Sequence, residues 1–207
     1  MTNSTNPIPR ADLKRFHTVG GRPPPREKRL RPVAPPRLSG ELVLTRDGRT
    51  FLLRDIHPDD VEALRRGFAE LTPEEIRLRF LHPLTDMPQL MAKEFCNIDS
   101  THAVALVLID PANSAEPTIR AVARAYIDPA TLAAEFALIV QHSLAGQGLG
   151  TMLMQRLIDA SRKRGATEMW GDVFSENGAM LELCDHLGFA RHSVFHDPGI
   201  VRVTLPL

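Results

Sequence analysis

A glycine-rich segment, Gly146-Gln147-Gly148-Leu149-Gly150, stands between a strand-like run and a helix-like run. Glycine adopts positive φ angles easily and lets a ligand approach the backbone closely. The amides at the start of the following helix lack intrahelical acceptors, and the helix dipole attracts anions there. The order strand, glycine-rich turn and helix therefore indicates a phosphate-binding loop built on the amides of residues 146–151, the last of them that of Thr151. A glycine-rich connection without a ligand would give the same pattern, so this alternative stays open at this point.

Two well-known phosphate loops do not fit the segment. A Walker loop needs Gly-Lys followed by Ser or Thr, which this chain lacks. A dinucleotide-binding fingerprint needs Gly-x-Gly-x-x-Gly and an acidic residue about 20 positions later. The glycines here are spaced Gly-x-Gly-x-Gly, and the acidic residue would be Glu168, inside an expected strand. The sequence therefore predicts neither a P-loop nucleoside triphosphatase nor a dinucleotide-dependent oxidoreductase.

Flanking residues connect the loop to a known family. Glu135-Phe136-Ala137-Leu138-Ile139-Val140 leads into it, and Asn177-x-x-Met180-x-x-x-Cys184-x-x-x-Gly188-Phe189 follows. This ordered set resembles the GNAT superfamily of N-acetyltransferases over roughly residues 49–207. Three sections look most like the acetyltransferase domain of bacterial Pat-type protein lysine acetyltransferases: residues 53–60, residues 77–80, and Glu176-Asn177 with Met180-Leu181. Ala145 departs from the family pattern, because this loop position usually carries Arg or Gln.

The resemblance implies a fold and an activity. It implies the GNAT fold, a mixed central sheet with helices on both faces and two central strands that splay apart around acetyl-CoA. The implied reaction moves the acetyl group of acetyl-CoA to a primary amine in a ternary complex, and the Pat-type likeness implies a protein lysine as acceptor. Two alternatives stay open: an acetyltransferase for small-molecule amines, and a non-catalytic acyl-CoA sensor or scaffold.

Glu135 is the candidate general base. A lysine amine is mostly protonated near neutral pH, because its pKa is about 10.4, and it must lose a proton before it can attack a thioester. A carboxylate near the amine can accept that proton directly or through water. Glu135 begins the strand that leads to the glycine loop, and a charged residue in an apolar strand is costly unless it is used or solvated. By resemblance, a glutamate at this strand position serves as the base in Pat-type relatives; a solvated strand-end glutamate is the alternative.

The remaining candidates contact the acyl donor. Main-chain groups of Leu138, Ile139 and Val140 are expected to bind extended pantetheine, as a peptide adds to a sheet edge. Asn177 would cap the next helix or bind pantetheine, and Met180 matches the family's later cofactor-contacting segment.

Cysteine, tyrosine and histidine residues give weaker expectations. Cys184 could protonate the departing CoA thiolate, although a buried cysteine with a packing role is the alternative. Tyr126, the only tyrosine, is expected in the core of a strand. His186, His192 and His196 near Cys184 lack the spacing of a metal site, so no metal is predicted.

Periodicity supplies the elements that position these residues. Strands are predicted at 42–44 and 50–56 around Asp47-Gly48, and then at 103–109, 119–127, 134–140, 167–173, 190–196 and 201–205. Helices are predicted from Pro58 and from Thr72-Pro73, over 88–95, after Gly150 and over 178–187. Antiparallel strands followed by β-α-β-α-β predict one mixed α/β sheet.

Composition separates the chain into two parts. Residues 1–40 hold nine basic and two acidic residues and eight of the 17 prolines, and we interpret them as a Pro/Arg-rich flexible arm. The arm's charge suits a nucleic acid or another acidic partner, with a passive solvated tail as the alternative. Residues 41–207 form the acetyltransferase domain. The apolar runs are too short to span a bilayer, no signal-like apolar region follows the start, and two cysteines make no disulfide framework, so a cytoplasmic protein without membrane contact is expected.

Overall fold

One mixed sheet organises the chain. The computed structural model describes residues 40–111, 116–195 and 197–207, so that the expected arm, apart from Gly40, and His196 lie outside the described residues. The sheet has eight strands in the order β1-β2-β3-β4-β5-β6-β8-β7. Every neighbouring pair is antiparallel except β5 and β6, which are parallel. The strands are β1 (Glu41–Leu44), β2 (Thr50–Asp55), β3 (Ala103–Ile109), β4 (Ile119–Ile127), β5 (Ala133–Val140), β6 (Glu168–Phe174), β7 (Ala190–Ser193) and β8 (Ile200–Pro206).

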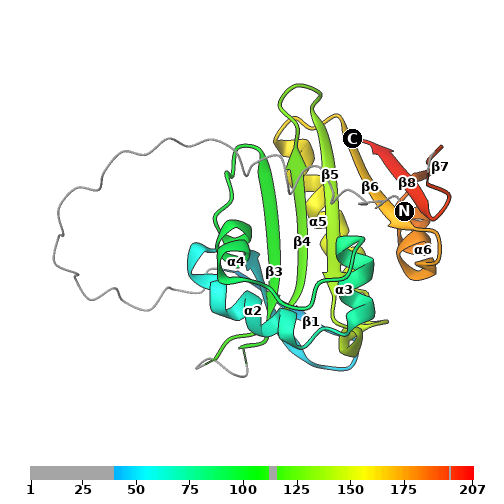
Figure 1. The fold of residues 1–207 in the computed structure, drawn as a ribbon. Coiled ribbons are helices and arrows are strands. Elements are labelled where there is room, and N and C mark those ends of the chain that lie inside the picture. Colours follow the sequence, from blue (N-terminus) through cyan, green and yellow to red (C-terminus); the bar gives the residue numbers. More distant parts are fainter. Residues whose placement is uncertain (1–39, 112–115, 196) are drawn as a thin grey trace.

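Helices cover both faces of the sheet (Figure 1). They are the short η1 (Pro58–Asp60) and η3 (His142–Leu144), and α2 (Val61–Ala69), α3 (Pro73–Phe80), α4 (Gln89–Cys96), α5 (Leu149–Lys163) and α6 (Gly178–His186). One core packs α5 and α6 against β3 to β6, and the other packs α2, α3 and α4 against the opposite face. The mixed α/β sheet predicted from the sequence is confirmed, with helices on both faces as the resemblance implied.

Local sequence signals explain where the helices begin. The Thr72 hydroxyl accepts a hydrogen bond from the Glu75 amide at 3.2 Å, and Glu75 accepts one from the Thr72 amide at 2.7 Å. This reciprocal cap satisfies amides that a helix start leaves free, so α3 begins at Pro73 as predicted. The helix expected from Pro58 is divided in the structure, because one turn of 3-10 helix, η1, precedes α2.

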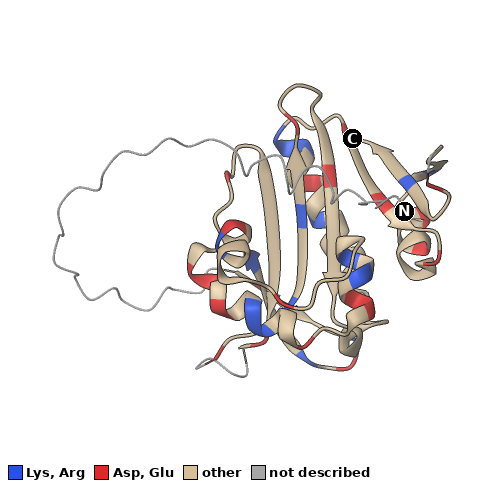
Figure 2. Cartoon of the chain, viewed as in Figure 1, with Lys and Arg blue, Asp and Glu red and all other residues tan. Residues whose placement is uncertain are grey.

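Charged residues of both signs are distributed over the sheet and the helices in the view of Figure 2. Within the described ranges, no helix is both long and apolar enough to cross a membrane. In the same part of the chain, no group of three or more His, Cys, Asp or Glu side chains could hold a metal ion.

Candidate active site

A cleft of about 1740 Å³ runs along the carboxyl-terminal half of β5. Its walls come from β4, β5, β6 and β8, from the glycine loop, and from α4 and α6. The residues predicted to bind the acyl donor all line it: Leu138, Ile139, Val140, Gly146, Gln147, Gly148, Leu149, Gly150, Thr151, Asn177 and Met180. Glu135 lines the same cleft. Segments separated by more than 40 residues in the sequence therefore share one cavity.

The cleft exists because β5 and β6 separate. Their parallel pairing is short and ends where Glu135 lies opposite Trp170. β5 continues to Val140, paired with β4 on its other side and with no β6 partner in the described residues. Backbone groups after Glu135 on the β6 side are therefore free to bind an extended ligand in the manner of an added strand.

Packing keeps the separated strands apart. Phe136 is 7% exposed, and its ring lies 5.5 Å from that of Phe189, edge to face. A Cβ atom added to Gly171 on β6 would lie 2.7 Å from the Phe136 ring. The ring therefore fills the space that a side chain at this position of β6 would need, and only glycine leaves room for it.

The glycine loop has the backbone geometry that a phosphate site requires. Gly146 and Gly148 have φ angles of 72° and 78°, in the left-handed region that favours glycine. Gly148 is the N-cap of α5, and no side chain caps this helix. The first amides of α5 thus lack a side-chain acceptor at the positive end of the helix dipole, which is a favourable place for an anion.

A hairpin that the sequence analysis did not assign to the site supports this loop. The turn between β1 and β2 donates a hydrogen bond from the Asp47 amide to the Gln147 side chain, at 3.1 Å. Arg46 donates to the Gly146 carbonyl at 3.4 Å, and Arg49 donates to the Ser143 carbonyl at 3.1 Å. These contacts span about 100 positions of the chain, so local patterns could not reveal them.

Glu135 lies among polar and aromatic groups where β5 and β6 diverge. It is half-buried, opposite Tyr126 on β4 and Trp170 on β6. The neighbouring Arg202 pairs with Asp172 through two hydrogen bonds of 2.8 and 2.7 Å and lies over the Trp170 ring. The hydrogen bond to Asp172 is the main cause that raises the pKa of Arg202, and the charge of Glu135 adds to it. A fixed cation therefore stands within electrostatic reach of the candidate base.

Tyr126 is not a core residue, contrary to the expectation from its strand. It is half-buried and lines the cleft opposite Glu135. Its neighbours Ala125 and Ile127 are the buried ones. Strand alternation explains the error, because the side chains of consecutive residues point to opposite faces.

Cys184 lies in the core and not in the cleft. It is 0% exposed and packs in the core cluster that contains α5 and α6, and it is not among the residues that line the cleft. Burial raises the pKa of its thiol to about 11. The expectation that Cys184 protonates the CoA thiolate is therefore corrected: the side chain has the packing role that the sequence left as the alternative.

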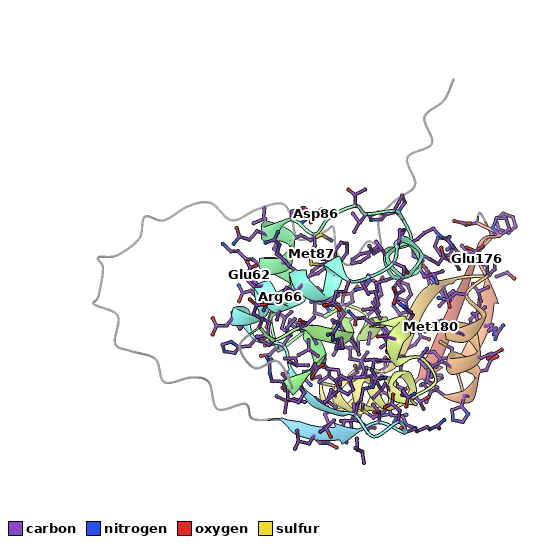
Figure 3. All side chains as sticks on the ribbon, turned by 90° about the horizontal axis from the view of Figure 1, so that it is seen from below. Glu62, Arg66, Asp86, Met87, Glu176 and Met180 are labelled. Atoms are coloured by element: carbon purple, nitrogen blue, oxygen red, sulfur yellow. The ribbon has the colours of Figure 1, made fainter. Side chains whose placement is uncertain are left out.

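The turn between β6 and α6 closes one side of the cleft. The Asn177 side chain accepts a hydrogen bond from the Met180 amide at 3.2 Å and so caps α6. Glu176, labelled with Met180 in Figure 3, forms an ion pair with Arg77 of α3. Arg77 also pairs with Glu74 at 2.8 Å and lies over the Phe174 ring. These contacts join α3 to the β6 side, a bridge that the sequence analysis did not anticipate.

Known proteins are similar to this chain in sequence. The profile of the "Acetyltransferase (GNAT) family" matches residues 71–189. An acetyltransferase of Pseudomonas aeruginosa is 28% identical over 69% of this chain and 76% of its own length. The ribosomal protein bS18 alanine N-acetyltransferase of Escherichia coli is 38% identical over 33% of this chain and 45% of that enzyme.

Two solved structures show the same fold. The GNAT domain of PAT from S. lividans has a TM-score of 0.72 at 24% identity, over 84% of this chain and 100% of that chain. The structure of yncA from Salmonella typhimurium with its cofactor acetyl-CoA has a TM-score of 0.53 at 19% identity, over 76% of this chain and 94% of that one. With its profile match, its separated β5 and β6 strands and its glycine loop, this chain belongs to the GNAT acetyltransferase family.

Proposed function

We propose that this enzyme transfers the acetyl group of acetyl-CoA to the primary amine of a protein lysine, with Glu135 as general base. The observation that carries the proposal is the position of Glu135. It stands at the last paired position of β5 and β6, in the same cleft as the glycine loop. A donor held by its phosphates at the loop and by pantetheine along β5 would place its thioester toward this carboxylate.

The residues have distinct roles in this proposal. The amides of residues 146–151 bind the diphosphate, and backbone groups of Leu138 to Val140 bind pantetheine. Asn177 keeps α6 in place through its cap, and Met180 lines the wall beside the donor. Each role depends on a backbone group or side chain that borders the cleft.

The reaction balances without a metal or a covalent enzyme intermediate. Glu135 accepts a proton from the ammonium group, directly or through water. The neutral amine nitrogen attacks the acetyl carbonyl carbon, the carbon–sulfur bond breaks, and CoA leaves as a thiolate. The attacking nitrogen loses its second proton to solvent, the thiolate takes up one proton from solvent, and Glu135 releases its proton to solvent before the next turnover. Arg202, held by Asp172, places a positive charge near this carboxylate.

The cleft is larger than a site for a single small molecule. Small-molecule sites typically occupy about 300–1,000 Å³, and this cleft of about 1740 Å³ has room for a donor and an inserted side chain. Charge does not select the acceptor, because the lining holds as many basic as acidic side chains: Arg46, Arg79, Lys93, Arg124 and Arg202 against Glu75, Glu94, Glu135, Asp172 and Asp197. The bS18 alanine acetyltransferase, which matches part of this chain, is named for a protein amine, and this supports the same class.

An acetyl-transfer assay tests the proposal. The purified protein is incubated with acetyl-CoA and either lysine-containing peptides or small amines, and released CoA thiol is measured. Glu135→Gln is expected to lower kcat/KM by about 10²- to 10⁴-fold, whereas its Kd for acetyl-CoA changes less than about threefold. Glu182→Gln, an exposed glutamate of α6 outside the cleft, is the matched control.

Three results would contradict parts of the proposal. Wild-type turnover in Glu135→Gln would show that Glu135 is not the general base. Higher kcat/KM for small amines than for every peptide would identify a small-molecule enzyme. Acetyl-CoA binding without transfer to any amine would indicate an acyl-CoA sensor.

A further inference from the structure

Arg46 is a cationic side chain at the mouth of the glycine loop that comes from a distant part of the chain. It lies in the turn between β1 and β2 and lines the same cleft as residues 144–151. Its Nη1 atom donates to the Gly146 carbonyl at 3.4 Å. Its Nη2 and Nε atoms lie 3.8 and 4.0 Å from the position that a Cβ atom of Gly148 would take. The guanidinium group therefore stands beside the loop where α5 begins.

Among the described residues, no carboxylate forms an ion pair with Arg46. Its neighbour Arg49 pairs with Asp47 through two hydrogen bonds of 2.9 and 2.6 Å, which fixes that side chain within the turn. Arg46 forms no ion pair within the described ranges and has only the long bond to Gly146. It is also exposed, so a ligand in the cleft can reach it.

The loop itself provides no full positive charge. Residues 145–151 read Ala-Gly-Gln-Gly-Leu-Gly-Thr, so only backbone amides and the helix dipole are available there. A diphosphate carries formal negative charges, and charge-assisted hydrogen bonds are roughly twice as strong as neutral ones. Arginine also matches phosphate oxygens with a planar fork of N–H donors.

The hairpin holds Arg46 in this place. The Asp47 amide donates to Gln147 at 3.1 Å, directly beside Arg46. The turn is closed by the Thr45 amide, which donates to the Arg49 carbonyl at 2.9 Å, and by Gly48 with a φ angle of 84°. Loop and hairpin thus form one contact surface, which keeps the backbone of Arg46 beside the loop.

We infer that Arg46 binds the diphosphate of the acyl-CoA donor, so that the β1–β2 hairpin forms part of the donor site. The inference rests on the proposed function, since it assigns a further ligand to the phosphate end of the same cleft. It also supplies, from another element, the cation that the loop lacks at Ala145.

Two donors of different length separate a phosphate contact from a structural role. Acetyl-CoA contains the diphosphate, and S-acetylpantetheine contains the same thioester without any phosphate. Arg46→Ala is expected to raise KM for acetyl-CoA about tenfold, with a much smaller effect on kcat. Its kcat/KM with S-acetylpantetheine is expected to equal that of Arg162→Ala, a control in the last turn of α5. Arg46→Lys should recover part of the affinity, because the charge is kept and the planar fork is lost.

The possible failures are distinguishable. Equal KM values for acetyl-CoA in Arg46→Ala and Arg162→Ala would overturn the inference and leave the proposed function intact. An equal loss with both donors would also overturn it and would give Arg46 a structural role. If the wild-type protein binds CoA but transfers no acetyl group, the proposed function fails and the Kd values of CoA and pantetheine test Arg46 instead. If the wild-type protein binds no CoA, both are wrong.

Discussion

Glu135 lies at the point of the sheet where the cleft begins, within reach of a ligand bound there. β6 pairs with β5 up to this residue, and the cleft opens directly after it. Arg202 lies nearby, and its Nε and Nη2 atoms each donate a hydrogen bond to the Asp172 carboxylate. A cation that Asp172 holds in place therefore stands near the candidate base.

Cys184 shows how a buried position decides the chemistry of a side chain. Burial raises the pKa of its thiol to about 11, so the group stays neutral in the range where the enzyme is assayed. Cys184→Ala is expected to lower the free energy of unfolding by about 1 kcal/mol, because a small cavity forms in the core. Urea denaturation measures this change.

Activity supplies the second readout for Cys184. The kcat of Cys184→Ala is expected to remain within about twofold of the wild type, and the pH profile between pH 7 and 9.5 should keep its shape because no thiol titrates there. A tenfold lower kcat together with loss of activity at the alkaline end of the pH profile would show that Cys184 protonates the CoA thiolate after all.

At the scale of elements, the glycine loop depends on Gly148. Its φ angle of 78° is unfavourable for any residue with a Cβ atom, and the left-handed conformation costs about 1–2 kcal/mol per residue. Gly148→Ala is expected to lower the free energy of unfolding by this amount and to raise KM for acetyl-CoA, since the loop amides shift. Gly178→Ala is the control, because a Cβ atom there meets nothing within 4 Å.

Outcomes for the two glycine variants are read by denaturation and by steady-state kinetics. A KM in Gly148→Ala equal to that in Gly178→Ala would mean that the loop backbone does not bind the donor.

Helix α3 is joined to the segment before the loop through Glu75. This carboxylate accepts hydrogen bonds from the Thr72 amide and hydroxyl at 2.7 and 2.8 Å and from the His142 amide at 2.7 Å. Burial alone would raise the pKa of Glu75, but these hydrogen bonds outweigh burial, and the pKa is lowered. At pH values above the pKa of Glu75 in the unfolded chain, near 4.3, its full contribution to the stability of the fold is present. This contribution is lost as the pH falls through the lower pKa that Glu75 has in the folded protein.

Replacing Glu75 should remove this pH dependence. Glu75→Gln is expected to lower the free energy of unfolding at pH 7 by about 1–2 kcal/mol, because hydrogen bonds to a charged acceptor are lost. From about pH 5 downward, the wild type should lose stability more steeply than the variant. Urea denaturation at pH 7, 5, 4 and 3 measures both effects, and parallel curves would contradict the assignment.

Element positions were predictable because their signals are local. The Thr72 cap, the Asp47-Gly48 turn and the alternation along β5 each depend on neighbours within a few positions. The point where β5 and β6 separate was implied only by the family resemblance. The packing of Phe136 against Gly171 at this point joins residues on two strands that no local pattern relates.

At the scale of the whole molecule, the family resemblance identified the cleft, but it did not identify every group around it. The candidate donor residues line one cavity as expected. Arg46, Arg202 and Tyr126 were missed as site residues because each comes from a strand or turn outside the motif. Tertiary docking alone brings them to the cleft, and a single sequence carries little information on such contacts.

The first 39 residues provide a test of domain organisation. The described residues alone contain both core clusters and every residue assigned to the site. A chain that begins at Gly40 is therefore expected to keep kcat/KM within about twofold of the full chain, and its midpoint of thermal unfolding should change little. A large loss of either would show that the domain requires the basic segment.

The same truncation tests the charge of that segment. Residues 1–40 hold nine basic and two acidic residues, so the full chain should be retained on a polyanion column at low salt more strongly than the truncated chain. Equal retention would leave the segment without a role in binding acidic partners.

A crystal structure with an unreactive thioether analogue of acetyl-CoA would show where the donor lies. We expect the diphosphate at the amides of residues 146–151, pantetheine along Leu138 to Val140 in the gap between β5 and β6, and the acyl end beside Glu135. Density for the analogue elsewhere, or a loop closed by its own side chains while β5 stays empty, would contradict this expectation.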